Sequence, residues 1–267
     1  MKENLSQSSE IKIPLLTPET REVVFGEIST IREQNGTSEV LIPQIDQLTE
    51  TAMRLGDYTS AMRLIQEKYL SSQHMVMESK LKHPLRSARG FSLMSTSLDA
   101  MIDLKTQHQD TIDSVWSARV FRFQGRHFDL IHQYPQSEKY YRQGIRFYNN
   151  LEPIEQRYQS LELSGFLSFS LLKQSEFVWY GVAQQTLSSF DKSPEGEWLK
   201  NQDYYTWAVW KSGIEIRNSG ALLGTKRESL YRENIISWLD NADAILTPNY
   251  DFSFRRQELS EVQSKLK

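Results

Sequence analysis

Cysteine is absent from the 267 residues of this chain, and glycine and proline are scarce. Without cysteine the chain has no disulfide framework, no thiolate ligands for zinc or iron–sulfur clusters and no cysteine nucleophile. The 12 glycines and 8 prolines fall below the usual combined share of about 12%. Turns are therefore few, and we expect long uninterrupted helices.

Long apolar runs are also missing, since no stretch approaches the roughly 18 apolar residues that span a bilayer. The first ten residues, MKENLSQSSE, lack the apolar core of a signal peptide. The 31 basic and 34 acidic side chains leave a net charge of −3, which disfavours a general nucleic-acid-binding field. These absences predict a soluble, intracellular, cytoplasmic protein.

The chain is predicted to have three parts. Residues 1–16 open with a polar stretch that has no periodicity, so we expect a disordered N-terminal arm. Thr17-Pro18-Glu19 has the chemistry of a helix start, and a single helical-repeat domain is expected over 17–250. Residues 251–267 are expected to form a charged C-terminal helix or capping segment.

Apolar residues recur with the 3.6-residue period of helices from about Thr17 onwards. No segment alternates as a strand would, so the fold class is predicted to be all-α with about 10–11 helices. Turns are expected at Asn35-Gly36, Gly56-Asp57 and Gln124-Gly125-Arg126, among others. After the first, the helices are expected near 42–55, 58–70, 85–104, 111–124, 135–150, 154–173, 176–191, 199–218, 228–245 and from 253.

Two stretches share one spacing of aromatic, small and large residues. The first is the turn Leu55-Gly56-Asp57-Tyr58 followed by Ala61 and Ile65, and the second is Tyr134, Ser137, Tyr141 and Gly144. Both resemble the tetratricopeptide repeat. The resemblance implies a degenerate TPR-like α-solenoid, a right-handed superhelix of antiparallel helix hairpins whose concave groove binds other proteins.

Catalytic and cofactor motifs are not found. The five histidines never lie three or four residues apart, so no helical metal face is encoded. The stretch 220–226 resembles a phosphate loop but is one residue short and follows no strand. The carboxylate pairs Asp99/Asp103 and Asp240/Asp243 are interpreted as solvated faces. We therefore predict no catalytic residue, no metal and no cofactor, and a protein that is not an enzyme.

Basic residues are concentrated in 111–150, which holds six basic and three acidic side chains. Arg119 and Arg122 lie three residues apart and thus on one helical face. If Ala118 and Phe121 occupy the packing positions of a repeat helix, the resemblance places both arginines on the concave side. Guanidinium forks suit carboxylates and phosphates. The alternative is that they pair with Asp113, Glu138 or a neighbouring repeat.

Aromatic residues crowd the segment before Gly213. Trp207 and Trp210 lie on one helical face and are expected in the core. Tyr204 and Lys211 lie one step round from that face, so they complete the predicted peptide-binding groove with Arg119 and Arg122.

These observations predict an interaction module that binds a protein or peptide segment, either anionic or with a free carboxylate, and does not bind membranes. Its oligomeric state is left open. The first alternative is RNA or nucleotide binding through 111–150, which the net charge disfavours. The others are an all-helical enzyme with an enclosed pocket and a self-assembling structural subunit.

Overall fold

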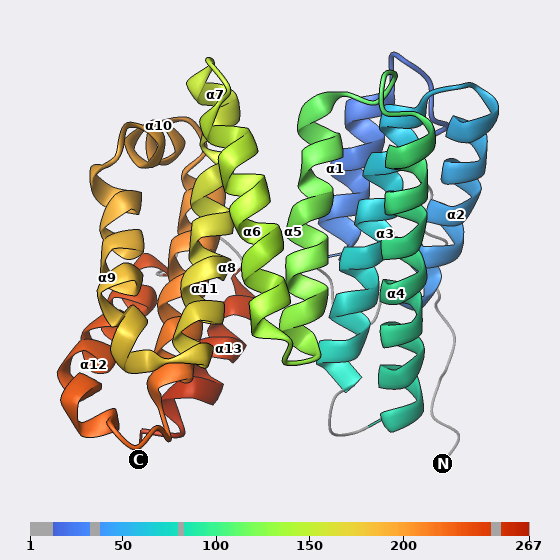
Figure 1. The fold of residues 1–267 in the computed structure, drawn as a ribbon. Helices are drawn as coiled ribbons and strands as arrows, with labels where there is room; N and C mark the ends of the chain where they lie inside the picture. The colour runs from blue at the N-terminus through green and yellow to red at the C-terminus, as the bar shows by residue number, and fades with distance from the viewer. Residues whose placement is uncertain (1–12, 33–37, 80–82, 247–251, 267) are drawn as a thin grey trace, which may run out of the picture. The chain divides into compact units, whose positions relative to one another are not determined.

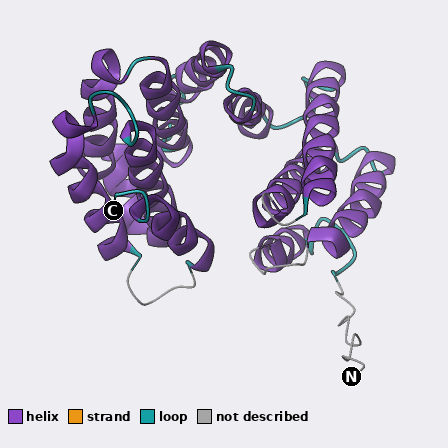
Figure 2. Cartoon of the chain, turned by 90° about the horizontal axis from the view of Figure 1, so that it is seen from below, coloured by secondary structure: helices purple, strands orange, loops and turns teal. Residues whose placement is uncertain are grey.

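The computed structural model describes residues 13–32, 38–79, 83–246 and 252–266, and these form helices and loops without a strand (Figures 1 and 2). The predicted all-α class is confirmed. The chain divides into two compact units, Met1–Val120 and Phe121–Lys267. The winding of the hairpins into a right-handed superhelix stays a prediction.

The N-terminal unit is built around α3, which packs against α2 and α4 and also contacts α1. Its core is aliphatic and rich in methionine, with Met62, Met75 and Met94 fully buried. Its helices are α1 (Arg21–Arg32), α2 (Ser38–Arg54), α3 (Tyr58–Ser79), α4 (Pro84–Gln107) and the first part of α5 (Ser114–Leu130).

The turn between α2 and α3 follows the predicted Gly56-Asp57 break. Gly56 has a φ of 71°, a left-handed conformation that glycine adopts without steric penalty. The Asp57 amide donates to the carbonyl of Ala52 at 2.9 Å and the Gly56 amide to that of Met53 at 3.1 Å, the two bonds of a Schellman turn. The Asp57 carboxylate then accepts from the Ser60 amide at 3.1 Å and caps α3.

The C-terminal unit surrounds α11, which contacts α8, α9, α10, α12 and α13. Because α11 has neighbours on most sides, twelve of its residues are buried. Besides the second part of α5, the helices are α6 (Tyr134–Asn149), α7 (Ile154–Arg157), α8 (Gln159–Gln174), α9 (Glu176–Lys192), α10 (Pro194–Gln202), α11 (Tyr204–Leu222), α12 (Glu228–Ile245) and α13 (Ser253–Gln263).

Several predicted boundaries need correction. The expected helix 154–173 is divided at Tyr158 into α7 and α8, and α10 was not expected as a separate helix. The helices of the described residues therefore run to α13, where about 10–11 were expected. The helix expected over 199–218 begins at Tyr204, where the Asp203 side chain caps it, and continues to Leu222. Residues 1–12 of the predicted arm and the Asn35-Gly36 turn lie outside the described residues, and Leu16 of the arm is buried.

The predicted turn at Gln124-Gly125-Arg126 is wrong, because α5 continues to Leu130. Gly125 serves close packing instead. A β-carbon at this position would come within 2.6 Å of Cδ1 and Cζ of the Tyr141 ring on α6, and Tyr141 is fully buried. The ring thus lies directly on the backbone of α5.

Replacing Gly125 by alanine should destabilise the protein by about 2 kcal/mol, because the buried Tyr141 ring has no room to retreat from the added methyl group. Gly181→Ala in α9 is the matched control, since a β-carbon there meets no atom within 4 Å. That control should stabilise by about 0.5–1 kcal/mol through helix propensity. Urea unfolding measures both, and a stabilising Gly125→Ala would contradict the packing argument.

Candidate functional site

Of the two arginines predicted for the site, Arg119 is the one whose guanidinium pairs with no described carboxylate. It lies half-buried on α5, in the N-terminal unit, with its Cζ 4.9 Å from the centroid of the Trp116 ring. Its Nε is buried without a hydrogen-bond partner, and no acidic side chain in the described part of the chain pairs with it. The guanidinium is held on an aromatic surface, and its Nη groups are left as donors for a ligand.

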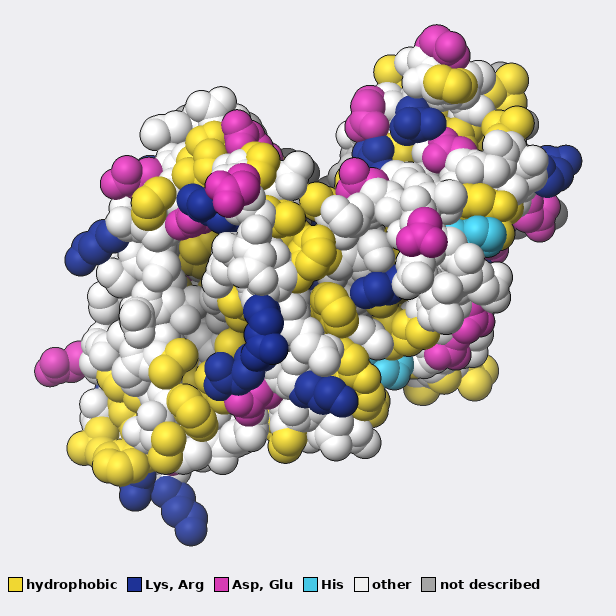
Figure 3. All heavy atoms as spheres, turned by 45° about the horizontal axis from the view of Figure 1, so that its top comes forward, with side chains coloured by type: hydrophobic (Ala, Val, Ile, Leu, Met, Phe, Trp, Pro, Cys, Tyr) yellow, Lys and Arg dark blue, Asp and Glu magenta, His cyan; other side chains and the backbone are white. Residues whose placement is uncertain are grey.

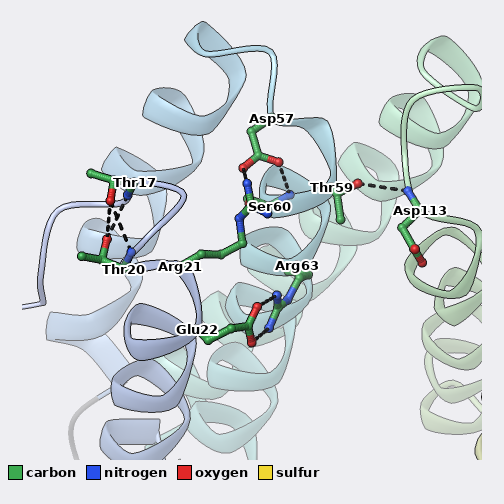
Figure 4. Close-up of polar contacts among 9 residues, drawn as sticks. All are labelled: Thr17, Thr20, Arg21, Glu22, Asp57, Thr59, Ser60, Arg63 and Asp113. Carbon is green, nitrogen blue, oxygen red and sulfur yellow. Dashed lines mark hydrogen bonds and ion pairs between the residues drawn. The ribbon is translucent and has the colours of Figure 1, made fainter. Parts of the chain in front are cut away.

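Trp116 is itself held by a second arginine. The Arg63 guanidinium of α3 lies 4.5 Å from the Trp116 ring and 3.7 Å from the Phe25 ring of α1. Arg63 also donates to both carboxylate oxygens of Glu22, at 2.6 and 3.0 Å (Figure 4). Rings and guanidiniums thus alternate from Phe25 through Arg63 and Trp116 to Arg119. Arg63 forms an ion pair with Glu22, whereas no described carboxylate pairs with Arg119.

Polar contacts fix the start of α5 against α3. The Thr59 hydroxyl accepts from the Asp113 amide at 3.0 Å (Figure 4), and Gln66 donates its side-chain amide to the Trp116 carbonyl at 3.1 Å. The Asp113 carboxylate caps α5 by accepting from the Val115 amide at 2.9 Å. These bonds place the Trp116 ring without using the fork of Arg119.

Ion pairs join α1 to α3 beside this site. Arg21 donates to Asp57 at 2.6 Å, and Asp57 also accepts from the Ser60 amide (Figure 4). Burial works to raise the pKa of Asp57, but the hydrogen bonds from Ser60 and the charge of Arg21 together hold it below the ordinary value. The hydrogen bond from Arg63 lowers the pKa of Glu22. Both carboxylates are therefore ionised at neutral pH.

Arg122, the second predicted arginine, has a partner within the C-terminal unit. Its Nε and Nη2 donate to Oε2 and Oε1 of Glu162 on α8, at 2.8 and 2.7 Å. The side chains are 15% and 6% exposed. The structure therefore gives Arg122 the pairing with a neighbouring helix that the sequence left as the alternative, and does not present Arg119 and Arg122 as two open forks.

Lys211 and Tyr204 come together around Trp207 in the C-terminal unit. The Lys211 ammonium lies 5.1 Å from the Trp207 ring and donates to both oxygens of Asp191 at 2.7 and 2.6 Å. Lys211 is buried, whereas Tyr204 is 40% exposed with its ring 5.3 Å from that of Trp207. Between these two predicted residues, Tyr204 is the one that reaches the surface.

Sequence reasoning missed Glu215, which is 2% exposed on α11. Its Oε2 has no hydrogen-bond partner. Burial raises its pKa to about 8; Lys211 opposes this rise and Asp191 adds to it. The four-residue spacing from Lys211 was the available signal, and it pointed to an ordinary helical ion pair rather than to a neutral acid.

Within the described ranges, no group of three or more histidine, aspartate or glutamate side chains is arranged to hold a metal ion. None of the helices described is long and apolar enough to cross a membrane. On the face shown in Figure 3, several basic side chains lie beside acidic ones.

No protein-family model, curated protein or solved structure matches the chain.

Proposed function

We propose that this chain is a binding protein whose N-terminal unit recognises a protein or peptide segment through a carboxylate. The observation that carries the proposal is the Arg119 guanidinium, held on Trp116 without an acidic partner. A TPR-like groove remains part of the proposal, since the paired α2 and α3 and the Gly56 turn are the features that resemble that family.

The chemistry of the site suits a carboxylate. An arginine fork binds a carboxylate through two parallel, charge-assisted hydrogen bonds, each contributing about 1.5–3 kcal/mol. Stacking on Trp116 limits the rotamers of Arg119 before the ligand arrives, which reduces the entropy lost on binding. An acidic side chain or a chain end supplies the required acceptor.

Binding of RNA through 111–150 has less support. Three of the six basic side chains in that segment are ion-paired within the chain: Arg122 with Glu162, Arg126 with Asp129 and Arg142 with Glu138. Phosphate binding would have to compete with these carboxylates.

The test uses a peptide library synthesised once with aspartate, glutamate and a free C-terminus, and once with asparagine, glutamine and an amidated C-terminus in their place. The wild-type chain should retain acidic peptides, and Arg119→Gln should bind a selected peptide at least tenfold more weakly, about 1.4 kcal/mol. Titration calorimetry measures the affinity, and thermal unfolding should place the melting temperatures within a few degrees.

Arg54→Gln is the matched control, because Arg54 is an exposed arginine of the same unit whose guanidinium reaches the Thr51 hydroxyl at 3.3 Å. Its affinity should equal that of the wild type. Equal retention of acidic and amide peptides, or equal affinity of Arg119→Gln and wild type, would reject the proposed function.

A further inference from the structure

Three guanidiniums surround one aromatic ring in the C-terminal unit. The Cζ atoms of Arg126 and Arg217 each lie 4.7 Å from the centroid of Phe166, and that of Arg122 lies 5.4 Å away. The arginines come from α5 and α11, and Phe166 lies on α8. The face and edge of a phenyl ring hold guanidiniums in place but do not neutralise them.

Four arginines lie close together in this part of the unit, and three of them each form an ion pair with a carboxylate. Arg122 pairs with Glu162, Arg126 with Asp129 at 3.6 Å, and Arg255 of α13 with Glu258. These six side chains and Arg217 are called the Phe166 cluster below.

Asp129 has further donors that occupy its oxygens. The Tyr141 hydroxyl donates to Oδ2 at 2.7 Å and the Ser170 hydroxyl donates to Oδ1. Asp129 is buried, and both of its oxygens already accept hydrogen bonds within its own unit, which makes it a poor acceptor for a fourth guanidinium.

Arg217 is the fourth arginine, and in the described part of the chain no acceptor forms a hydrogen bond or ion pair with it. It is half-buried, so it keeps contact with solvent. Burial and the neighbouring Arg255 lower the pKa of Arg217, which Glu258 and Glu162 only partly oppose. Its charge is poorly compensated in this position.

Gly213 lets two of the guanidiniums converge. A β-carbon at this position would lie 2.7 Å from Cζ of Arg255 and 3.0 Å from Nη2 of Arg217. Two cations share the space above one glycine, while Glu258 pairs with only one of them. Guanidiniums placed side by side in this way repel each other unless an anion lies between them.

We propose that the Phe166 cluster is a binding site for a small oxyanion with one negative charge, held mainly by Arg217 and Arg255. Among the described residues of the cluster, four arginines face three carboxylates, and one carboxylate or one singly charged phosphate group would balance the remaining positive charge. Guanidinium forks fit the oxygens of both groups. This site is independent of the function proposed for Arg119.

The test compares thermal unfolding in sodium acetate, in sodium phosphate at a pH where the monoanion dominates, and in sodium chloride at equal ionic strength. At the acid pH of the phosphate series, acetate or phosphate should raise the wild-type melting temperature by about 3 °C in a saturable manner, and chloride should not. A larger effect of acetate identifies a carboxylate as the ligand group, and a larger effect of phosphate identifies a phosphoryl group; either supports the site.

Two variants make the test specific. Arg217→Gln should bind the anion at least tenfold more weakly and should melt at or above the wild-type temperature in chloride, because it removes a poorly compensated charge. Gly213→Ala keeps every charge but places a methyl group where the guanidiniums converge, so it should also lose the response. Gly181→Ala, with open space around it, should respond like the wild type.

The proposal is overturned if neither oxyanion raises the wild-type melting temperature above that in chloride. It is equally overturned if Arg217→Gln and Gly213→Ala keep the full response. A marked fall in the melting temperature of Arg217→Gln in chloride would also reject it, since it would show that Arg217 holds the fold together through a partner of its own.

Discussion

Replacing Arg122 by glutamine should lower the free energy of unfolding by about 3 kcal/mol. The change leaves the carboxylate of Glu162 buried without its bidentate partner, and loss of one member of a buried ion pair is far more damaging than loss of both. Urea unfolding of Arg122→Gln, Glu162→Gln and the double variant measures the coupling between the two side chains.

Arg142→Gln is the control for this experiment, because Arg142 forms an ion pair with Glu138 while its own side chain is half exposed. Such a pair contributes about 0.2–1 kcal/mol. If Arg122→Gln loses no more stability than Arg142→Gln, the pair with Glu162 is not the stabilising contact described here. If Arg122 is needed for stability in this way, binding has to be tested with Arg119 alone. A variant that changes both arginines would lose a ligand contact and folding stability at the same time.

Stability should decrease as the pH rises from about 5 to about 8, and Glu215→Gln should remove much of that decrease. The folded pKa of Glu215 lies near 8 against an ordinary value of 4.5, so above pH 4.5 the unfolded chain releases a proton that the folded chain retains. The stabilising contribution is therefore complete below pH 4.5 and is lost progressively up to about pH 8. The full difference is on the order of 5 kcal/mol.

Urea unfolding of the wild type and Glu215→Gln across this pH range checks the prediction, with Glu261→Gln as an exposed control on α13. The charged groups that act on Glu215 are Lys211 and Asp191, which form their own ion pair. Glu215→Gln should be the more stable protein at pH 8. Parallel pH profiles for all three proteins would show that Glu215 is ionised in the folded state.

The apolar periodicity and the turn residues of the sequence predicted the helices, but one of the predicted turns was wrong. Gly56 and Gly125 look alike in the sequence, and both were expected in turns. Gly56 is in a turn, with its positive φ, whereas Gly125 lies inside α5 because the Tyr141 ring packs against it. The end of α5 depends on His132, which has a φ of 60° and completes a Schellman turn through the amide of Gln133. Nothing in the local sequence marks a histidine for that conformation.

The candidate site was predictable only in part for a related reason. The concentration of arginines in 111–150 pointed to Arg119 and Arg122 alike, and helical spacing treats them as equivalent. What separates them is Glu162, which lies 40 residues further along the chain and reaches Arg122 through the packing of α8. The stack of Arg63, Trp116 and Arg119 likewise depends on a contact between α3 and α5 that no periodicity reveals.

The course of α5 has a consequence for experiments that divide the chain. The division of the chain into two units falls between Val120 and Phe121, in the interior of a helix that runs from Ser114 to Leu130. A fragment ending at Val120 would leave the carbonyls of its last turn without amide partners, and one beginning at Phe121 would expose four amides and lose the Asp113 cap. Gene fragments for either half must therefore overlap, and both must encode the whole of α5.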